Sequence, residues 1–172
     1  MQANLNARLG KQDVLLLAGD MPASFQRDYP SRPFVVQLAA DGNVNNLQIS
    51  RISAELPGAL SLTGSGHVQQ ITDSIHRSAD IDLQLRTQRL DFLLSLAGIP
   101  RDGSIAIPPL SMNAGVKMNG SQLAANLLAR EGVGRLTLNG TYNLASEAYK
   151  ADVKIDSLQV NHFLPRDSIY SL

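Results

Sequence analysis

Short runs in which apolar and polar residues alternate fill most of this chain and restrict the folds open to it. Residues 135–144 place Leu136 and Leu138 at alternate positions, with polar residues between them. Residues 60–69 have the same arrangement, beginning at Leu60. A period of two residues is typical of a β-strand with one apolar and one polar face. We therefore expect an all-β fold whose strands each have one face in contact with water.

The pattern of the following strand also occurs twice. Residues 79–86 alternate Ala, Ile and Leu with Asp, Gln and Arg, and residues 149–156 alternate in the same way. Recurrence of a strand pair at a fixed spacing is the signature of a repeated structural unit. We predict one β module over residues 1–172, built from two similar repeats at 34–100 and 110–172.

One segment has the period of a helix. In residues 90–98, Leu90, Leu93 and Leu94 fall at helical spacing, and Gly98 is placed to end the helix. We expect a short amphipathic helix that either lies over the end of the sheet as a lid or fills the core as a cap. Residues 158–164 stand at the equivalent place in the second repeat.

The remaining segments of the first 60 residues complete the expected sheet. Residues 4–10 and 13–21 are predicted to be strands, and residues 21–33, which contain three prolines, a loop. The Asp-Gly pair at 41–42 predicts a hairpin turn between two strands. The apolar positions change phase near residues 50–51, as a β-bulge would cause.

A further Asn-Gly pair, at residues 119–120, predicts a second hairpin turn. Three glycines, Gly64, Gly66 and Gly140, fall on the apolar side of their strands, where glycine weakens a strand. Two explanations stay open. The glycines permit a bend in a strongly coiled sheet, or the missing side chains make room for another molecule.

Composition excludes several functions. Hydrophobic residues make up 44% of the chain, but aromatic residues only 5%, so the apolar face is aliphatic. The formal net charge is zero and no block of Lys or Arg occurs, which argues against nucleic acid as a partner. The longest apolar run, residues 14–18, is far too short to span a bilayer. We expect a piece of a longer protein whose membrane anchor or signal lies elsewhere, since residues 169–172 still alternate.

No catalytic or metal-binding arrangement is found in the sequence. His67, His76 and His162 stand in different segments, and cysteine is absent, so we predict no metal site and no cofactor. Asp80 and Asp82 share a strand face, as a catalytic pair of carboxylates would, but polar neighbours on that face favour a solvated outer surface. We expect a protein that is not an enzyme.

Three motifs follow one another in the same order in both repeats. A Leu-x-Leu-x-Gly strand precedes an Ala-Asp-Ile/Val strand, which precedes a short Leu- or Asn-containing helix, at 60–65, 79–81 and 90–93 and again at 136–141, 151–153 and 160–165. This combination resembles the AsmA-like superfamily, and most closely its TamB branch, the translocation and assembly module proteins of Gram-negative envelopes. The resemblance covers nearly the whole chain.

The resemblance implies a periplasmic protein that is tethered to the inner membrane through a segment outside these residues. Its curled antiparallel sheet would form a U-shaped or solenoid-like trough lined with aliphatic side chains, with one or two short helices. The trough would hold or conduct phospholipid acyl chains between the inner and outer membranes, or the protein would support outer-membrane protein assembly together with an assembly partner. The trough-lining residues expected are Leu60, Leu62, Ile81, Leu83, Leu85, Ala114, Val116, Met118, Leu136, Leu138, Tyr142, Val153 and Ile155.

Two further points follow from an open sheet. Its end strands have unpaired backbone groups, which could pair with a second copy of the chain. The alternative is a closed β-sandwich that acts as an adhesin, a glycan-binding module or a spacer, with a dry core and function on its loops. The trough predicts an open apolar interior, whereas the sandwich predicts a closed core, and this difference distinguishes the two hypotheses.

Overall fold

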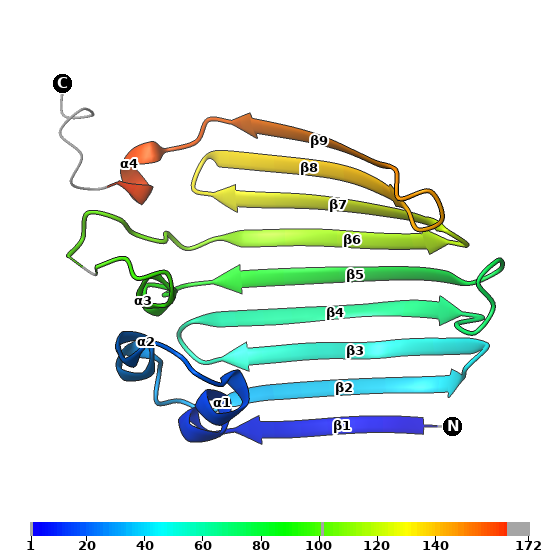
Figure 1. The fold of residues 1–172 in the computed structure, drawn as a ribbon, viewed down its shortest axis with the longest axis horizontal. Helices are drawn as coiled ribbons and strands as arrows, with labels where there is room; N and C mark the ends of the chain where they lie inside the picture. The colour runs from blue at the N-terminus through cyan, green and yellow to red at the C-terminus, as the bar shows by residue number, and fades with distance from the viewer. Residues whose placement is uncertain (1, 101, 165–172) are drawn as a thin grey trace.

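The computed structural model describes residues 2–100 and 102–164, which form one antiparallel sheet of nine strands (Figure 1). Each strand pairs with its neighbours in the sequence, so the order across the sheet is β1 to β9. The strands are β1 Gln2–Leu9, β2 Phe34–Asn43, β3 Asn46–Leu56, β4 Leu60–Gln69, β5 Ser78–Thr87, β6 Ser111–Asn119, β7 Gln122–Glu131, β8 Gly134–Asn143 and β9 Tyr149–Asp156. β1 and β9 lie at opposite edges, and the sheet is not closed. The expected all-β, curled antiparallel sheet is confirmed.

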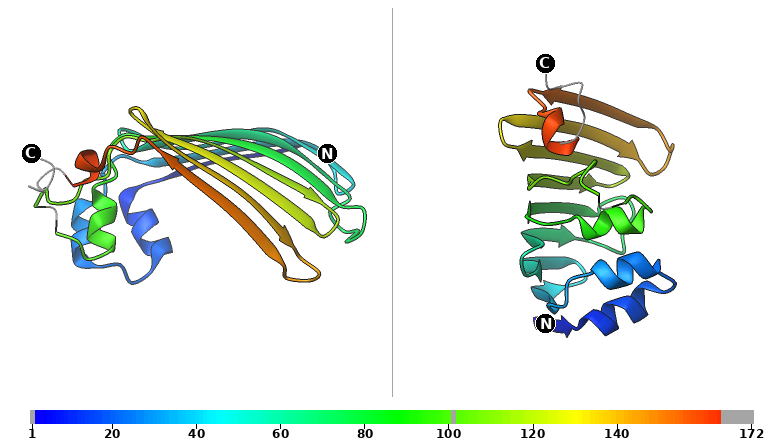
Figure 2. Two further views of the ribbon diagram at one scale, coloured as in Figure 1. Left: turned by 90° about the horizontal axis from the view of Figure 1, so that it is seen from above. Right: turned by 90° about the vertical axis from the view of Figure 1, so that its left-hand side faces the viewer.

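A closed sandwich needs a second sheet that packs against the first. The described residues form only one sheet, so the closed β-sandwich is wrong as the fold of this part of the chain. The sheet twists and arches along its length, and three helices lie together beneath one end of it (Figure 2). These are α1 Lys11–Ala18, α2 Ala23–Asp28 and α3 Phe92–Leu96; a fourth, α4 Val160–Phe163, follows β9.

The prediction of a strand at residues 13–21 is wrong, because α1 occupies most of this segment. The apolar run there is rich in leucine, which favours a helix, and a short apolar run does not by itself distinguish helix from buried strand. The N–H of Gly10 donates a hydrogen bond to the carboxylate of Asp13, with 2.8 Å between the nitrogen and Oδ2. This bond fixes the start of the helix.

The loop expected at residues 21–33 contains α2. Pro22 precedes the helix, where the missing N–H of proline costs nothing. Phe25 and Tyr29 are both buried, so tertiary packing rather than a long apolar stripe holds this short segment in helical form.

The turn predicted at Asp41-Gly42 is wrong by three residues. β2 continues to Asn43, Gly42 pairs with Leu47, and the chain reverses between Asn43 and Asn46. The side-chain Oδ1 of Asn43 accepts hydrogen bonds from the N–H groups of Asn45 and Asn46 at 2.9 and 3.1 Å. An Asn side chain that satisfies the turn in this way competes successfully with the Asp-Gly signal.

Other local predictions agree with the structure. The second hairpin is present, with the turn between Asn119 and Gln122 and Gly120 at a φ of 56°. The pairing of β3 with β4 shifts between Ile49 and Ile52, which confirms the bulge. Because of this extra residue, Ile49 and Ile52 both point to the apolar side of the sheet.

The helix predicted at residues 90–98 is present but shorter, as α3. It ends at Leu96 with Ala97 as the C-cap residue, and Gly98 follows with a φ of 71°, the left-handed conformation expected after a helix. Phe92 and Leu94 are buried, so α3 fills a core as a cap. α4 starts later than the segment predicted at 158–164, and Pro165 and residues 169–172 lie outside the described residues.

A small aromatic cluster at one end of the sheet is the main buried core. Phe25, Tyr29 and Phe92 contact one another, with ring centroids 5.5 to 6.0 Å apart. Leu56 and Ala59, at the β3–β4 turn, complete the buried set. We call α1, α2 and α3 with this cluster the helical cap.

The order of four strands and a short helix occurs twice, as β2–β5 with α3 and β6–β9 with α4. The two repeats at 34–100 and 110–172 stay a prediction.

Candidate functional site

The strand register places apolar side chains opposite one another across the whole sheet. Side chains of directly paired residues point to the same face, so each chain of pairs defines a row. The central row consists of Leu5, Leu38, Ile52, Gly64, Leu83, Ala114, Leu127, Leu138 and Val153.

Rows on both sides of the central one are also apolar. Nearer the helical cap lie Ala7, Val36, Ala54, Leu62, Leu85, Met112, Ala129, Leu136 and Ile155. On the other side lie Ala3, Ala40, Ile49, Gly66, Ile81, Val116, Ala125, Gly140 and Ala151. A partial fourth row runs through Leu47, Val68, Ala79, Met118, Leu123, Tyr142 and Tyr149. We call these four rows the apolar face.

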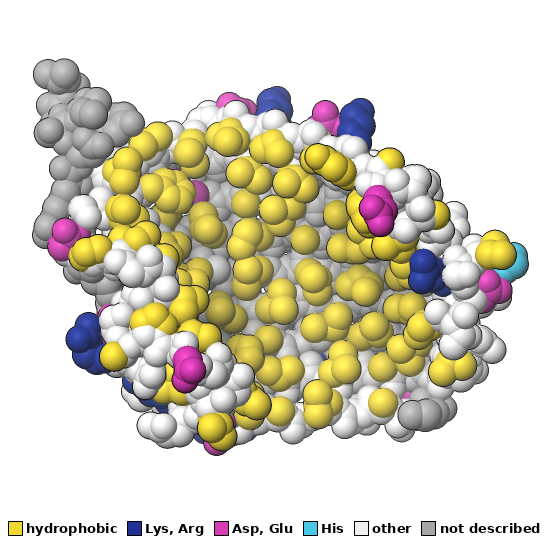
Figure 3. Space-filling view, in the orientation of Figure 1, with side chains coloured by type: hydrophobic (Ala, Val, Ile, Leu, Met, Phe, Trp, Pro, Cys, Tyr) yellow, Lys and Arg dark blue, Asp and Glu magenta, His cyan; other side chains and the backbone are white. Residues whose placement is uncertain are grey.

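Hydrophobic side chains cover the front of the sheet almost without interruption, and charged side chains lie around its margin (Figure 3). The helical cap lies on the same side and covers only one end of it. The chain exposes 11294 Å² of surface. A compact monomer of 18.5 kDa is expected to expose about 8,200 Å². The excess is what a sheet without a second layer produces.

All thirteen residues predicted to line a trough lie on the apolar side of the sheet. Twelve of them belong to the four rows, and Leu60 packs instead against the core of the helical cap. Most are partly buried by their neighbours, while Val153 and Ile155 on the edge strand are 58% and 57% exposed.

The prediction omitted the contributions of β1, β2, β3 and β7. Their alternation was visible in the sequence, for example at Leu5 and Leu38, but a continuous row follows only from the register. In β7, Ala124 and Leu128 place apolar residues on the polar side as well, which weakens the signal of alternation.

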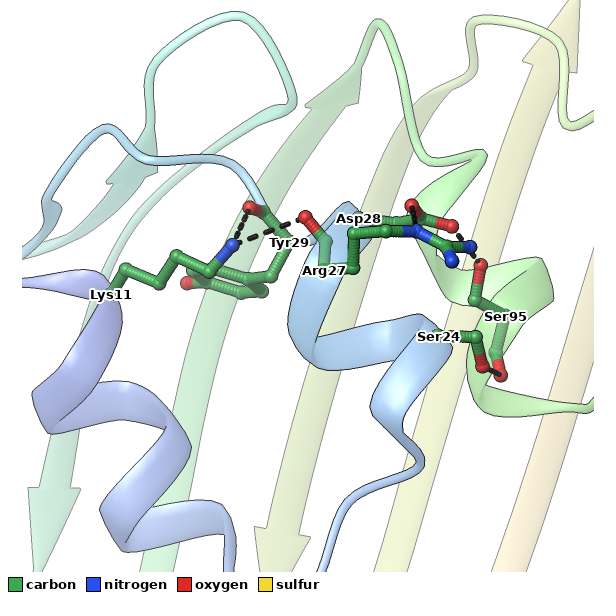
Figure 4. Close-up of polar contacts among 6 residues, drawn as sticks. All are labelled: Lys11, Ser24, Arg27, Asp28, Tyr29 and Ser95. Atoms are coloured by element: carbon green, nitrogen blue, oxygen red, sulfur yellow. Dashed lines mark hydrogen bonds and ion pairs between the residues drawn. The ribbon is translucent and has the colours of Figure 1, made fainter.

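Polar contacts hold the helical cap together (Figure 4). The ammonium group of Lys11 donates hydrogen bonds to the carbonyl oxygens of Arg27 and Tyr29 at 3.2 and 3.0 Å, which joins α1 to α2. The hydroxyl of Ser95 donates to Oδ2 of Asp28 at 2.6 Å, which joins α3 to α2. Ser95 is buried, so this bond forms away from bulk water.

The strand glycines do not all leave free space. A Cβ atom on Gly64 would lie 2.6 Å from Cδ2 of Leu83, and one on Gly66 would lie 2.9 Å from Cγ1 of Ile81. Side chains of β5 therefore occupy the space beside these two glycines. The explanation that the missing side chains make room for another molecule is wrong at Gly64 and Gly66. At Gly140 the nearest atom is 3.6 Å away, which is ordinary contact distance.

The opposite face of the sheet is polar and solvated. Asp80 forms an ion pair with Lys117 on β6 at 3.1 Å, and both side chains are more than half exposed. Asp82 pairs across β5 and β6 with Gly115. These contacts match a solvated outer surface rather than a pair of catalytic carboxylates.

The three histidines have separate partners. His67 Nε2 lies 2.6 Å from Oδ1 of Asn46, and His76 Nδ1 lies 2.7 Å from Oδ2 of Asp73. The hydrogen bond from the His76 side chain, together with those from the backbone N–H groups of Ile75 and His76, lowers the pKa of Asp73 to about 2. His162 on α4 contacts the buried carboxylate of Glu131 at 2.5 Å. Among residues 2–100 and 102–164, no three His, Asp or Glu side chains come together as metal ligands would.

Comparisons with protein-family models, with curated proteins and with solved structures found no match. In the described part of the chain, no helix has the length and hydropathy needed to span a membrane.

Proposed function

We propose that the apolar face accommodates phospholipid acyl chains, which it holds or conducts between the inner and outer membranes, without catalysing a reaction. The observation that carries this proposal is the alignment of aliphatic side chains into rows across nine strands, with no second layer of the described chain over most of them. A continuous apolar surface of this extent, on a face of the sheet that no second layer covers, indicates a binding site for a hydrophobic molecule.

The magnitudes favour such a role. Each buried CH₂ group is worth about 0.8 kcal/mol, so an acyl chain with ~14 of these groups would lose on the order of 11 kcal/mol on passing through water. An aliphatic surface along the route removes most of this barrier. It adds little net affinity, because a membrane at either end buries the same groups.

The side-chain chemistry of the rows suits a chain that slides. The central row consists of Leu, Val, Ile, Ala and Gly, which offer no side-chain hydrogen bond. Each directional bond to a moving ligand would have to be broken before the next step, at a cost of about 1 kcal/mol. Dispersion contacts with aliphatic groups vary little as a hydrocarbon moves.

The resemblance to the AsmA-like superfamily supports the location included in the proposal. The protein would act in the periplasm, tethered to the inner membrane through a segment outside these 172 residues. Support of outer-membrane protein assembly, with an assembly protein as partner, is the other activity implied by the resemblance. Both activities would use the same apolar face, so they differ in the molecule that contacts it.

Site-specific photo-crosslinking in cells tests the proposal and separates the two activities. A photoreactive residue is placed at Val116 or at Leu138 on the apolar face, and at Lys117 or Thr137 on the polar face as the matched neighbour. We expect phospholipid adducts, identified by mass spectrometry, at the two apolar positions only. Protein adducts at these positions would favour assembly. Absence of adducts, or equal labelling of both faces, would contradict the proposal.

A further inference from the structure

The outer edge of β9 is unusually open for a strand of a soluble protein. No described element lies beyond it (Figure 1). Every residue of β9 is exposed, and Tyr149 is 83% exposed. The strand contains no proline, and its pairing with β8 has no bulge. Native sheets usually protect an edge by such devices, because unpaired backbone groups accept another strand.

The hydrogen-bond pattern identifies which backbone groups are free. The N–H of Asn143 donates to the carbonyl of Ala148 at 2.8 Å, so this pair begins the β8–β9 ladder. Bonded and non-bonded pairs alternate in an antiparallel ladder. Lys150, Asp152 and Lys154 are therefore bonded to β8, and the N–H and C=O groups of the residues between them point to the free edge. These residues are Ala151, Val153 and Ile155.

Charges alternate along the polar side of the same strand. Lys150, Asp152, Lys154 and Asp156 follow one another at every second position, and the β8–β9 register places them all on the polar face. Lys150 and Asp152 are only loosely paired, at 3.7 Å, with side chains 78% and 70% exposed. When a second copy of this strand is aligned antiparallel to the first, each positive charge can lie opposite a negative one.

We infer that two copies of this chain associate through β9, antiparallel, about a two-fold axis that passes between the two Val153 residues. In this register Lys150 of one copy lies opposite Asp156 of the other, and Asp152 lies opposite Lys154. The free backbone groups meet as well, because Ala151 lies opposite Ile155 and Val153 opposite Val153. Each of these pairs exchanges two hydrogen bonds.

Only this register satisfies the charges over the full strand. If one strand were displaced by two residues along the other, Lys150 would lie opposite Lys154, and Asp152 opposite Asp152. Both pairings are repulsive. A shift by one residue would place apolar side chains opposite charged ones on the wrong face. The alternation of signs therefore selects a single alignment.

The symmetry of this contact limits the assembly to two copies. A two-fold axis perpendicular to the sheet keeps both apolar faces on the same side, so the rows continue from one copy into the next. Pairing of β9 with β1 of another copy would be head-to-tail and would produce open polymers. β1 offers no matching charges, since its polar side contains Gln2, Asn4, Asn6 and Arg8. The inference does not depend on lipid binding.

Cysteine pairs test the register, because the chain contains no cysteine of its own. Asp152→Cys and Lys154→Cys are made as separate variants. In the inferred register, these positions form a non-bonded pair with Cα atoms about 4.5 Å apart, which suits a disulfide. We expect a disulfide-linked dimer when the two variants are mixed under oxidising conditions, and little from either variant alone. Equal crosslinking in all three samples, or none in the mixture, would overturn the register.

Charge variants test the association itself. Asp152→Lys with Asp156→Lys makes the polar row of β9 entirely basic, and Lys150→Asp with Lys154→Asp makes it entirely acidic. By sedimentation velocity we expect each variant to dimerise at least about tenfold more weakly than the unmodified chain, because all four ionic pairs become repulsive.

An equimolar mixture of the basic and acidic variants should restore the dimer, which a misfolded variant could not do. Circular dichroism checks the fold of each variant. A monomeric unmodified chain throughout the micromolar range, polymers that grow with concentration, or a mixture no stronger than its components would each overturn the inference.

Discussion

The stability cost of the same substitution at two leucines on neighbouring strands would show whether the apolar face is open in solution. Leu56 on β3 lies under the helical cap and is 2% exposed, whereas Leu38 on β2 belongs to the uncovered central row and is 36% exposed. Both side chains point to the same side of the sheet. Leu56→Ala and Leu38→Ala remove the same atoms, so their difference reports the surroundings alone.

The expected magnitudes follow from burial. Truncation of a fully buried leucine to alanine loses about 2.4 kcal/mol of transfer free energy, at about 0.8 kcal/mol per CH₂. At Leu56 an enclosed cavity adds to this, for a total of about 3 to 4 kcal/mol. At Leu38 only roughly two thirds of the side chain is buried, so about two thirds of the transfer free energy is lost. The space left is open to water and adds no cavity cost, so the loss is about 1.5 kcal/mol.

Urea unfolding monitored by circular dichroism measures the difference. With a slope of about 2 kcal/mol per molar urea, a difference of about 2 kcal/mol separates the two midpoints by about 1 M. Equal losses at Leu38 and Leu56 would mean that a second layer covers the central row in solution. The face would then have no room for a hydrocarbon chain, and the reasoning behind the proposed function would fail.

Two other predictions follow from local contacts. Gly66→Ala should destabilise the protein by about 1 to 3 kcal/mol because its Cβ would meet Ile81, while Gly140→Ala should be nearly neutral in the same urea assay. Equal effects would contradict the difference in space at the two positions. NMR titration should give Asp73 a pKa of about 2, which His76→Ala raises toward 3.8. Because the folded pKa is depressed, this contribution to stability is present above pH 3.8 and is lost as the pH falls through about 2; an unchanged pKa in the variant would rule out His76 as the cause.

Alternation predicted β4, β5 and β9 closely, because local period is the property that defines a half-exposed strand. The predicted bounds of β4 and β9 agree with the structure, and those of β5 differ by one residue at each end. The bulge near Ser50 could also be predicted from the sequence, because an extra residue must change the phase of the apolar positions.

The errors concern segments whose structure depends on distant residues. The apolar run of α1 is compatible with a buried strand or a helix, and only its contact with the aromatic cluster decides between them. α2 is too short to be stable alone, and it forms because Phe25 and Tyr29 pack against Phe92, far away in the sequence. The turn after β2 depended on one Asn side chain rather than on glycine.

The sequence by itself determined that this chain builds strands with one aliphatic and one polar face, because side-chain alternation is set residue by residue along the backbone. Only the tertiary structure decided that nine such strands join into a single open layer, that the apolar positions align into rows, and that three helices gather over one end. These outcomes depend on register and burial, which are properties of residues brought together from distant parts of the chain.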